Sequence, residues 1–195
     1  MTTKRNGTAH FIDYSKRLQD ALTTADWTLA HQLSLALLES WQNGRRVFIC
    51  GNGGSAGNAI HLANDFIYGI AKKTGGGLKV MALSANSAVI TCLANDVGYD
   101  FIFSEQLAVQ AQKGDLLIAL SGSGNSGNIV QALEQARAMG VTSFAILGFT
   151  GGKCKELADF AIHFPVNDMQ IAEDLQLIVG HMCMQWLAQQ NLSAS

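Results

Sequence analysis

Residues 47–58 read Val-Phe-Ile-Cys-Gly-Asn-Gly-Gly-Ser-Ala-Gly-Asn, a short apolar run that opens directly into a glycine-rich loop. Residues 116–128 repeat this arrangement, because Leu-Leu-Ile-Ala-Leu is followed by Ser-Gly-Ser-Gly-Asn-Ser-Gly-Asn. A stretch with helical character follows each loop, at 55–70 and at 126–139. A buried strand, a glycine loop and a helix in this order are typical of parallel α/β folds.

The remainder of the chain continues this alternation. Further strands are predicted at 78–83, 143–147 and 161–164. Further helices are predicted at 87–93, 101–112 and 171–189, with two more over 11–41 that break near Thr24 and Asp26. The fold class is therefore α/β: a three-layer α/β/α sandwich with a mostly parallel five-stranded sheet and extra N-terminal helices. In such sheets, ligands bind at the carboxyl ends of the strands.

Length and composition predict one domain over residues 1–195. The chain has 195 residues, of which 48% are hydrophobic and 14% charged, enough for one substantial core. We expect residues 1–44 to form N-terminal helices used in oligomerisation, and residues 45–195 to form the α/β core and the C-terminal helix. The helix expected at 171–189 is apolar around much of its circumference, which also indicates contacts between subunits.

Charge and apolar run length exclude several classes of partner. Thirteen Lys and Arg stand against fifteen Asp and Glu, so the net charge of −2 provides no basic excess for nucleic acid. The apolar runs are shorter than the roughly 18 residues that span a bilayer, and Met1–Gly7 lacks the apolar segment of a signal peptide. We therefore expect a cytoplasmic protein that binds no membrane. The four scattered cysteines indicate neither a cysteine zinc site nor a disulfide framework.

The first glycine loop has the small residues that let backbone amides approach an anion at a helix N-terminus. Ser55 adds a hydroxyl donor. The loop also meets the loosest form of a dinucleotide-binding motif. However, the second strand ends in Ser84-Ala85-Asn86, without the acidic residue that would bind a ribose hydroxyl. A nucleotide cofactor is therefore not expected.

The second glycine loop places three hydroxyls, from Ser121, Ser123 and Ser126, within six residues. Together with the free amides of a helix start, these neutral donors can surround a phosphate group. The loop contains no lysine and is not a Walker A sequence, which favours a sugar monophosphate over a nucleoside triphosphate. The competing interpretation is that serine and glycine only cap a helix and form a turn.

Five segments together resemble the sugar isomerase (SIS) domain family: Gly51-Asn-Gly-Gly-Ser55, His61, Ala94-Asn-Asp96, Ser121-Gly-Ser-Gly-Asn-Ser126 and Gly151-Gly-Lys153. Within it, the chain resembles the isomerases of seven-carbon sugar phosphates. The resemblance implies a flavodoxin-like topology and a homotetramer with sites at subunit interfaces. It also implies interconversion of sedoheptulose 7-phosphate and D-glycero-D-manno-heptose 7-phosphate.

The resemblance also implies which residues form the site. The substrate positions fall on Asn52, Gly53, Gly54, Ser55, Asn95, Asp96, Ser121, Gly122, Ser123, Ser126 and Glu173. The metal positions, which hold zinc in some members, fall on His61, Asp65, Glu173 and His181, and the catalytic positions on Asp65 and His181. The family pattern has glutamate at position 65 and glutamine at position 173. An arginine that normally follows the acid is replaced here by Tyr68-Gly69-Ile70.

Helical geometry supports part of this set. His61 and Asp65 are four residues apart and therefore share one helix face. Glu173 and His181 are eight apart, about 80° out of alignment at 100° per residue. Asp174 is better aligned with His181 and stays a possible substitute. Two imidazoles and two carboxylates match a tetrahedral Zn²⁺ site, so one zinc ion per subunit is expected.

Two other functions stay open at this point. One is a noncatalytic SIS scaffold similar to the bacterial protein that associates with the replication initiator. That relative lacks the acid and the terminal-helix histidine, whereas this chain has Asp65 and His181. The other is isomerisation of a hexulose or pentose phosphate. His10, His31 and His163 have no comparable neighbours in the sequence and are interpreted as structural.

Overall fold

The computed structural model describes residues 7–190 and contains a five-stranded sheet in the order β2-β1-β3-β4-β5. The strands are β1 Arg46–Cys50, β2 Lys79–Ala82, β3 Leu116–Ser121, β4 Thr142–Leu147 and β5 Phe160–His163. Every neighbouring pair is parallel. The predicted five-stranded parallel sheet is confirmed, and the order of its strands is the flavodoxin-like one.

The two glycine loops leave neighbouring strands at the centre of the sheet. In the register of β1 and β3, Cys50 pairs with Ala119, so the two strands end at the same edge. From β1 the chain moves outward to β2 and then returns to the other side of β1 at β3. This reversal of strand order is the place where ligands bind in open α/β sheets.

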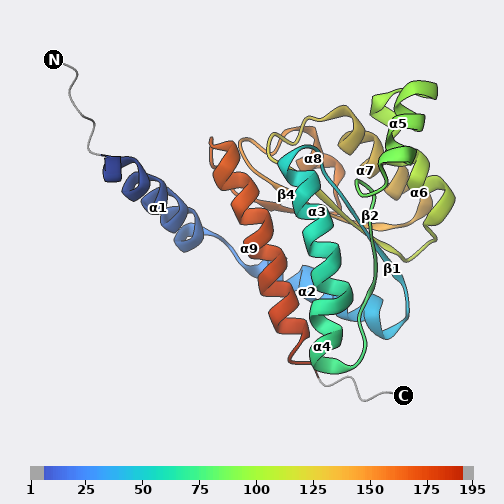
Figure 1. The fold of residues 1–195 in the computed structure, drawn as a ribbon, viewed down its shortest axis with the longest axis horizontal. Helices are drawn as coiled ribbons and strands as arrows, with labels where there is room; N and C mark the ends of the chain where they lie inside the picture. The colour runs from blue at the N-terminus through green and yellow to red at the C-terminus, as the bar shows by residue number, and fades with distance from the viewer. Residues whose placement is uncertain (1–6, 191–195) are drawn as a thin grey trace.

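Helices cover both faces of the sheet and complete the three layers (Figure 1). One face carries α2 Thr28–Gln42, α3 Gly54–Asn64 and α9 Met169–Leu187, whose core side chains include Leu37, Leu62 and Val179. The other face carries α6 Ser104–Gln110, α7 Gly127–Met139 and α8 Gly152–Leu157. The short helix α5 Ser87–Asp96 buries no residue fully. The α3 and α9 helices lie side by side, and both carry predicted site residues.

The helix after the first loop contains a local change of hydrogen bonding. Helix α3 continues without a break into a π-helical turn, η1 Asp65–Gly69, and then into α4 Ile70–Thr74. The predicted helix over 55–70 is therefore confirmed, and it extends four residues further. Single π-turns inside α-helices occur frequently at functional sites. Here the turn begins at the predicted acid, Asp65.

Two elements differ from the sequence prediction. The predicted helix over 101–112 is split into the 3₁₀ turn η2 Tyr99–Phe101 and α6. Helix α8 was not predicted, because it has six residues and fully buries only Cys154, so it has no apolar period. Within the described part of the chain, no helix is long and apolar enough to cross a membrane.

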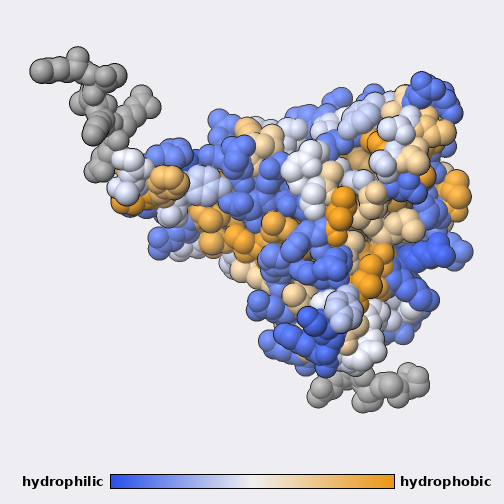
Figure 2. Space-filling view, in the orientation of Figure 1, coloured by the Kyte–Doolittle hydropathy of each residue, from blue (hydrophilic) through white to orange (hydrophobic). Residues whose placement is uncertain are grey.

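The N-terminal helix α1 Gly7–Thr24 projects from the body of the domain (Figure 1). Its one fully buried residue is Ala21. Polar contacts attach it to α9, from Arg17 to Asp168 and from Tyr14 to Asp174. Apolar side chains stay exposed along α1 (Figure 2), including Phe11, which is 71% exposed. Helix α1 is thus an addition to the three-layer core, whereas α2, the second N-terminal helix, packs within one of its layers.

Candidate functional site

The two glycine loops meet in one pocket of about 250 Å³ at the carboxyl ends of β1 and β3. Helix α9 closes its third side. The pocket is lined by Asn52, Gly53, Gly54, Ser55, Leu120, Ser121, Gly122, Ser123, Ser126, Met169 and Glu173. The structure therefore brings together nine predicted substrate residues from three separate parts of the chain.

The second glycine loop, residues 121–126, is called the serine loop below. It presents hydroxyl groups and a helix N-terminus to this pocket. Ser121 is buried, and its Oγ accepts a hydrogen bond of 3.0 Å from the backbone N–H of Gly124, which fixes the turn. Gly124 has φ +68°, and a Cβ there would overlap the carbonyl oxygen of Gly151. Ser126 is the N-cap residue of α7, yet its side chain makes no capping hydrogen bond. Its hydroxyl and the first amides of α7 are thus available to a ligand.

The first loop is held by side chains from α7 and α9. Asn52 donates to Oδ1 of Asn128 at 2.8 Å and accepts from Nδ2 of Asn128 at 2.9 Å, while the Tyr99 hydroxyl donates to Asn52 Oδ1 at 3.1 Å. Gln176 donates from Nε2 to Ser55 Oγ at 3.0 Å. Gln176 is fully buried, so this contact joins α9 firmly to the start of α3. The positions of Asn52 and Ser55 are therefore determined by neighbours outside the loop.

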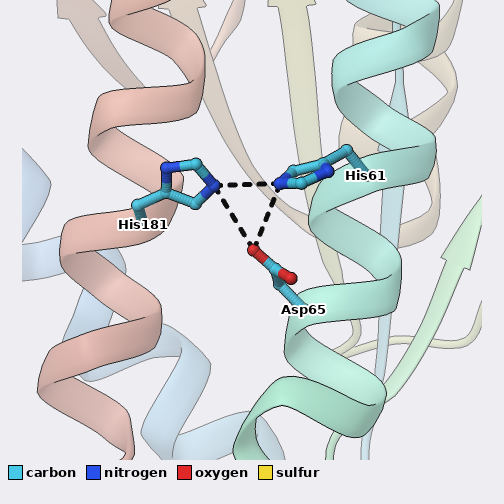
Figure 3. Close-up of side chains that lie close together, drawn as sticks. All are labelled: His61, Asp65 and His181. Carbon is cyan, nitrogen blue, oxygen red and sulfur yellow. Dashed lines mark hydrogen bonds and ion pairs between the residues drawn. The ribbon is translucent and has the colours of Figure 1, made fainter.

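A second group of predicted residues comes together between α3 and α9, further along both helices than the pocket. His61 from α3, Asp65 from η1 and His181 from α9 point toward one another (Figure 3). The two Nε2 atoms are 3.0 Å apart, and each lies 3.4 Å from Asp65 Oδ2. The side chains of His61 and His181 are 51% and 41% exposed, while that of Asp65 is 16% exposed. The two imidazoles are thus partly exposed to solvent, whereas the carboxylate is largely enclosed.

This three-residue group fits a divalent metal ion by its donor chemistry. Two imidazole nitrogens and one carboxylate oxygen form a common catalytic zinc set. In a tetrahedral site with bonds of 2.0–2.1 Å, ligand atoms lie about 3.3 Å apart. The separations of 3.0 and 3.4 Å observed here match that spacing. His61, Asp65 and His181 could therefore hold a metal ion with little movement.

Glu173 does not belong to the three-residue group, although it was expected among the metal ligands. Its carboxylate lies against Gly54, in the space that a Cβ at Gly54 would occupy. Eight residues along α9 correspond to about 12 Å, so Glu173 reaches the first loop while His181 reaches Asp65. The structure thus places Glu173 in the lining of the substrate pocket, and its predicted role as a metal ligand stays a prediction. Asp174 instead accepts a hydrogen bond from Tyr14.

Asn95 and Asp96 are not brought to the pocket. They end α5, where Asn95 Nδ2 donates to Asp96 Oδ1 at 2.7 Å and both residues are exposed. That hydrogen bond, with a second from the Cys92 thiol, lowers the pKa of Asp96. Their predicted role in substrate binding stays a prediction.

Sequence reasoning missed four residues that shape the site: Tyr99, Asn128, Met169 and Gln176. Asn128 is the last residue of the serine-loop motif, and an asparagine fully buried at a helix start is a detectable signal for a specific hydrogen bond. Tyr99, Met169 and Gln176 reach the loops only through long-range packing, and no local pattern identifies them.

Comparison with known proteins agrees with the fold and identifies the family. The family model described as the SIS domain matches residues 10–148. The phosphoheptose isomerase of Rhodospirillum rubrum is 41% identical over 143 residues, which cover 73% of this chain and 76% of that protein. The phosphoheptose isomerase of Aneurinibacillus thermoaerophilus is 35% identical over 154 residues, covering 79% and 77%. The solved phosphoheptose isomerase of Neisseria gonorrhoeae superimposes with a TM-score of 0.83 at 27% identity, over 92% of this chain and 95% of that one. The chain therefore belongs to the SIS domain family, among relatives that are phosphoheptose isomerases.

Proposed function

We propose that this protein is an aldose–ketose isomerase that converts sedoheptulose 7-phosphate into D-glycero-D-manno-heptose 7-phosphate for heptose biosynthesis. The observation that carries the proposal is the pocket where the serine loop, the first glycine loop and α9 meet. His61, Asp65 and His181 lie close together on α3, the turn η1 that follows it, and α9. A phosphosugar site and a set of proton-carrying groups are the two parts that this reaction needs. The sequence relatives point to the same reaction class.

The phosphate group binds in the serine loop. Hydroxyls of Ser123 and Ser126 and the amides at the start of α7 donate to its oxygens, while buried Ser121 holds the turn. These donors carry no charge, and among residues 7–190 no lysine or arginine lines the pocket. Asn52 and the backbone of the first loop bind sugar oxygens. Asn95 and Asp96 would contribute from α5 where subunits assemble.

Isomerisation moves one hydrogen from C1 to C2 and one from O1 to O2 of the open-chain sugar. A base removes a proton from C1, and O2 gains a proton, which gives an enediol. Return of a proton to C2 and loss of a proton from O1 complete the aldose. We assign the carbon proton to Asp65 and the oxygen proton to His181, each through the atom that a zinc ion on Oδ2 and Nε2 would leave free, Oδ1 of Asp65 and Nδ1 of His181. His61 contacts both of these groups.

A zinc ion would be held by His61, Asp65 and His181. When bound, it would supply a Lewis acid that polarises the sugar carbonyl. Other residues of the chain bind and position the substrate. Ser126 and the α7 amides orient the phosphate, the Asn128 amide holds Asn52, and Gln176 holds Ser55 at the pocket wall.

We further propose a homotetramer whose sites lie between subunits. Support comes from the projecting α1, where Phe11 and Ile12 are 71% and 53% exposed, and from the partial exposure of His61 and His181. A neighbouring subunit would cover these surfaces. The four cysteines are free thiols, which fits the reducing cytoplasm where we place the enzyme.

The test is to incubate the protein and a zinc salt with sedoheptulose 7-phosphate and to follow the sugar by NMR. We expect aldose signals to grow while ketose signals decline. An unchanged spectrum from a folded, metal-loaded protein would overturn the proposal. If only a hexulose or pentulose phosphate reacts, the protein is an aldose–ketose isomerase with a different substrate.

A further inference from the structure

The serine loop is supported from behind by the turn between β4 and α8, residues 148–151. The backbone N–H of Gly148 donates to the carbonyl oxygen of Gly122 at 2.9 Å, and that of Cys154 donates to the carbonyl oxygen of Gly124 at 2.9 Å. The two segments also touch closely, because a Cβ at Gly124 would overlap a carbonyl oxygen of this turn. The conformation of the turn therefore helps to determine the shape of the serine loop.

Phe149, in this turn, has a backbone conformation that its side chain disfavours. Its φ is +45°, and among residues 7–190 no other residue except glycine has a positive φ. The left-handed region costs free energy for any residue with a Cβ, and bulky residues rarely adopt it. Such a conformation persists only where neighbouring groups hold it in place.

Both backbone polar groups of Phe149 are held by β5 and the segment that follows it. The Phe149 N–H donates to the carbonyl oxygen of Val166 at 3.0 Å. The Phe149 carbonyl oxygen lies 3.0 Å from Nε2 of His163, the last residue of β5. Lys155 Nζ lies 3.2 Å from Nδ1 of the same ring, and because an ammonium group only donates, Nδ1 accepts and Nε2 carries the hydrogen. His163 thus donates to the Phe149 carbonyl group.

From these contacts we propose that His163 is a positioning residue for phosphate binding. It holds Phe149 in the left-handed conformation and so keeps the serine loop in the shape that receives a phosphate. His163 lies outside the pocket lining and outside the group of His61, Asp65 and His181, so it acts through the turn alone. This inference rests on the proposed function in one respect, because it takes the serine loop as the phosphate site.

The physical cost of the left-handed conformation determines the size of the effect. Without the hydrogen bond from His163, the population of this conformation at Phe149 should fall by about tenfold, the factor that it costs a residue with a Cβ. The apparent affinity for phosphate falls with that population. The proton-carrying groups lie on α3, η1 and α9, away from the turn, so the turnover number should change far less.

The experiment measures binding of sedoheptulose 7-phosphate to the zinc-loaded protein by calorimetry, with steady-state kinetics in parallel. His163→Ala should weaken binding about tenfold and change the turnover number less than about twofold. His163→Gln should restore most of the affinity, because its amide nitrogen corresponds in position to Nε2 and donates to the same carbonyl group. If His163→Ala does not fold, His163→Asn takes its place, since its shorter amide corresponds to Nδ1 and does not reach that carbonyl group.

Two variants of Phe149 test the route of the effect. Phe149→Gly provides a residue that adopts positive φ freely, so in that background His163→Ala should weaken binding less than about threefold. Phe149→Ala is the matched control, because it also removes the ring but keeps a Cβ. In that background His163→Ala should still weaken binding about tenfold.

Three outcomes would overturn the inference: unchanged binding in folded His163→Ala, no recovery in His163→Gln, and equal losses in the two Phe149 backgrounds. All variants are also titrated with inorganic phosphate, which tests the serine loop without the sugar and should show the same pattern. If the wild type binds inorganic phosphate but not sedoheptulose 7-phosphate, the proposed function fails and the phosphate series decides the role of His163. If the wild type binds neither, both proposals are overturned.

Discussion

Asn52 and Asn128 exchange two side-chain hydrogen bonds, of 2.8 and 2.9 Å, across 76 positions of the chain. Asn128 is fully buried at the start of α7, whereas Asn52 lines the pocket. The Tyr99 hydroxyl also donates to Asn52 Oδ1. Because Asn128 and Tyr99 together occupy that oxygen, Asn52 has one N–H left to offer a sugar oxygen.

The first prediction concerns this amide pair. Asn128→Ala leaves Asn52 free to rotate, which costs about 1–2 kcal/mol of substrate binding and raises KM about tenfold. The turnover number should change less than KM, because Asn128 is remote from the proton-carrying groups. Steady-state kinetics provide both values. Gln131→Ala, on the exposed part of α7, should change neither, and an unaltered KM in folded Asn128→Ala would show that Asn128 does not position Asn52.

The second prediction concerns zinc. If His61, Asp65 and His181 hold the ion, added zinc should raise the melting temperature, because it binds only the folded chain. His61→Asn should abolish most of that rise and lower zinc affinity at least tenfold. Chelator competition and elemental analysis measure the two effects. His10→Asn, on exposed α1, is the matched control, and an equal loss of affinity in both variants would exclude this group as the zinc site.

Much of the fold was predictable from local pattern. The apolar runs that became β1 and β3 are buried along nearly their whole length, which is why periodicity and flanking glycines identified them. The short helix α8 escaped prediction because only Cys154 is fully buried there. The π-turn at Asp65 also has no sequence signature, since it is a shift of backbone hydrogen bonds inside a continuous helix.

The site was predictable where its residues are close in sequence. His61 and Asp65, four apart on one helix, do lie together. The distant His181 was placed by family resemblance alone, since only the packing of α9 on α3 brings it to Asp65. The same resemblance places Glu173 among the metal ligands, but the structure does not bring Glu173 to the group of His61, Asp65 and His181. An eight-residue spacing separates its carboxylate from His181 along the helix, and the contact with Gly54 determines where it lies.

The third prediction concerns Asp65. Its side chain is one methylene shorter than a glutamate, yet Oδ2 lies 3.4 Å from both imidazoles. Asp65→Asn keeps the shape but removes both the base and a charged zinc ligand, so turnover should fall by a factor of about 10² or more. Binding of sedoheptulose 7-phosphate, measured by calorimetry, should stay within about threefold, because the phosphate contacts lie in the serine loop. Retained turnover would mean that another group moves the carbon proton.

The fourth prediction concerns Asp168, which caps α9 and attaches α1. Its Oδ1 accepts hydrogen bonds from the backbone N–H groups of Gln170 and Ile171 at 3.0 and 3.1 Å, and Oδ2 pairs with Arg17. Asp168→Ala should lower the free energy of unfolding by about 1–2 kcal/mol, which corresponds to a fall in melting temperature of about 2–8 °C. Urea and thermal unfolding measure this loss.

The same residue gives the stability a defined pH dependence. The hydrogen bond from Arg17, and then the amide of Ile171, hold the pKa of Asp168 below its ordinary value. A carboxyl with a lowered pKa in the folded chain stabilises it at pH values above the ordinary pKa of about 3.9, and the contribution disappears as the pH falls through the lowered value. The stability difference between wild type and Asp168→Ala should therefore be full at pH 7 and shrink below about pH 4.

Asp13→Ala is the control, because it removes only the exposed partner of Arg17 and should cost less than about 0.5 kcal/mol. A difference that persisted undiminished at pH 2 would show that ionised Asp168 is not its source.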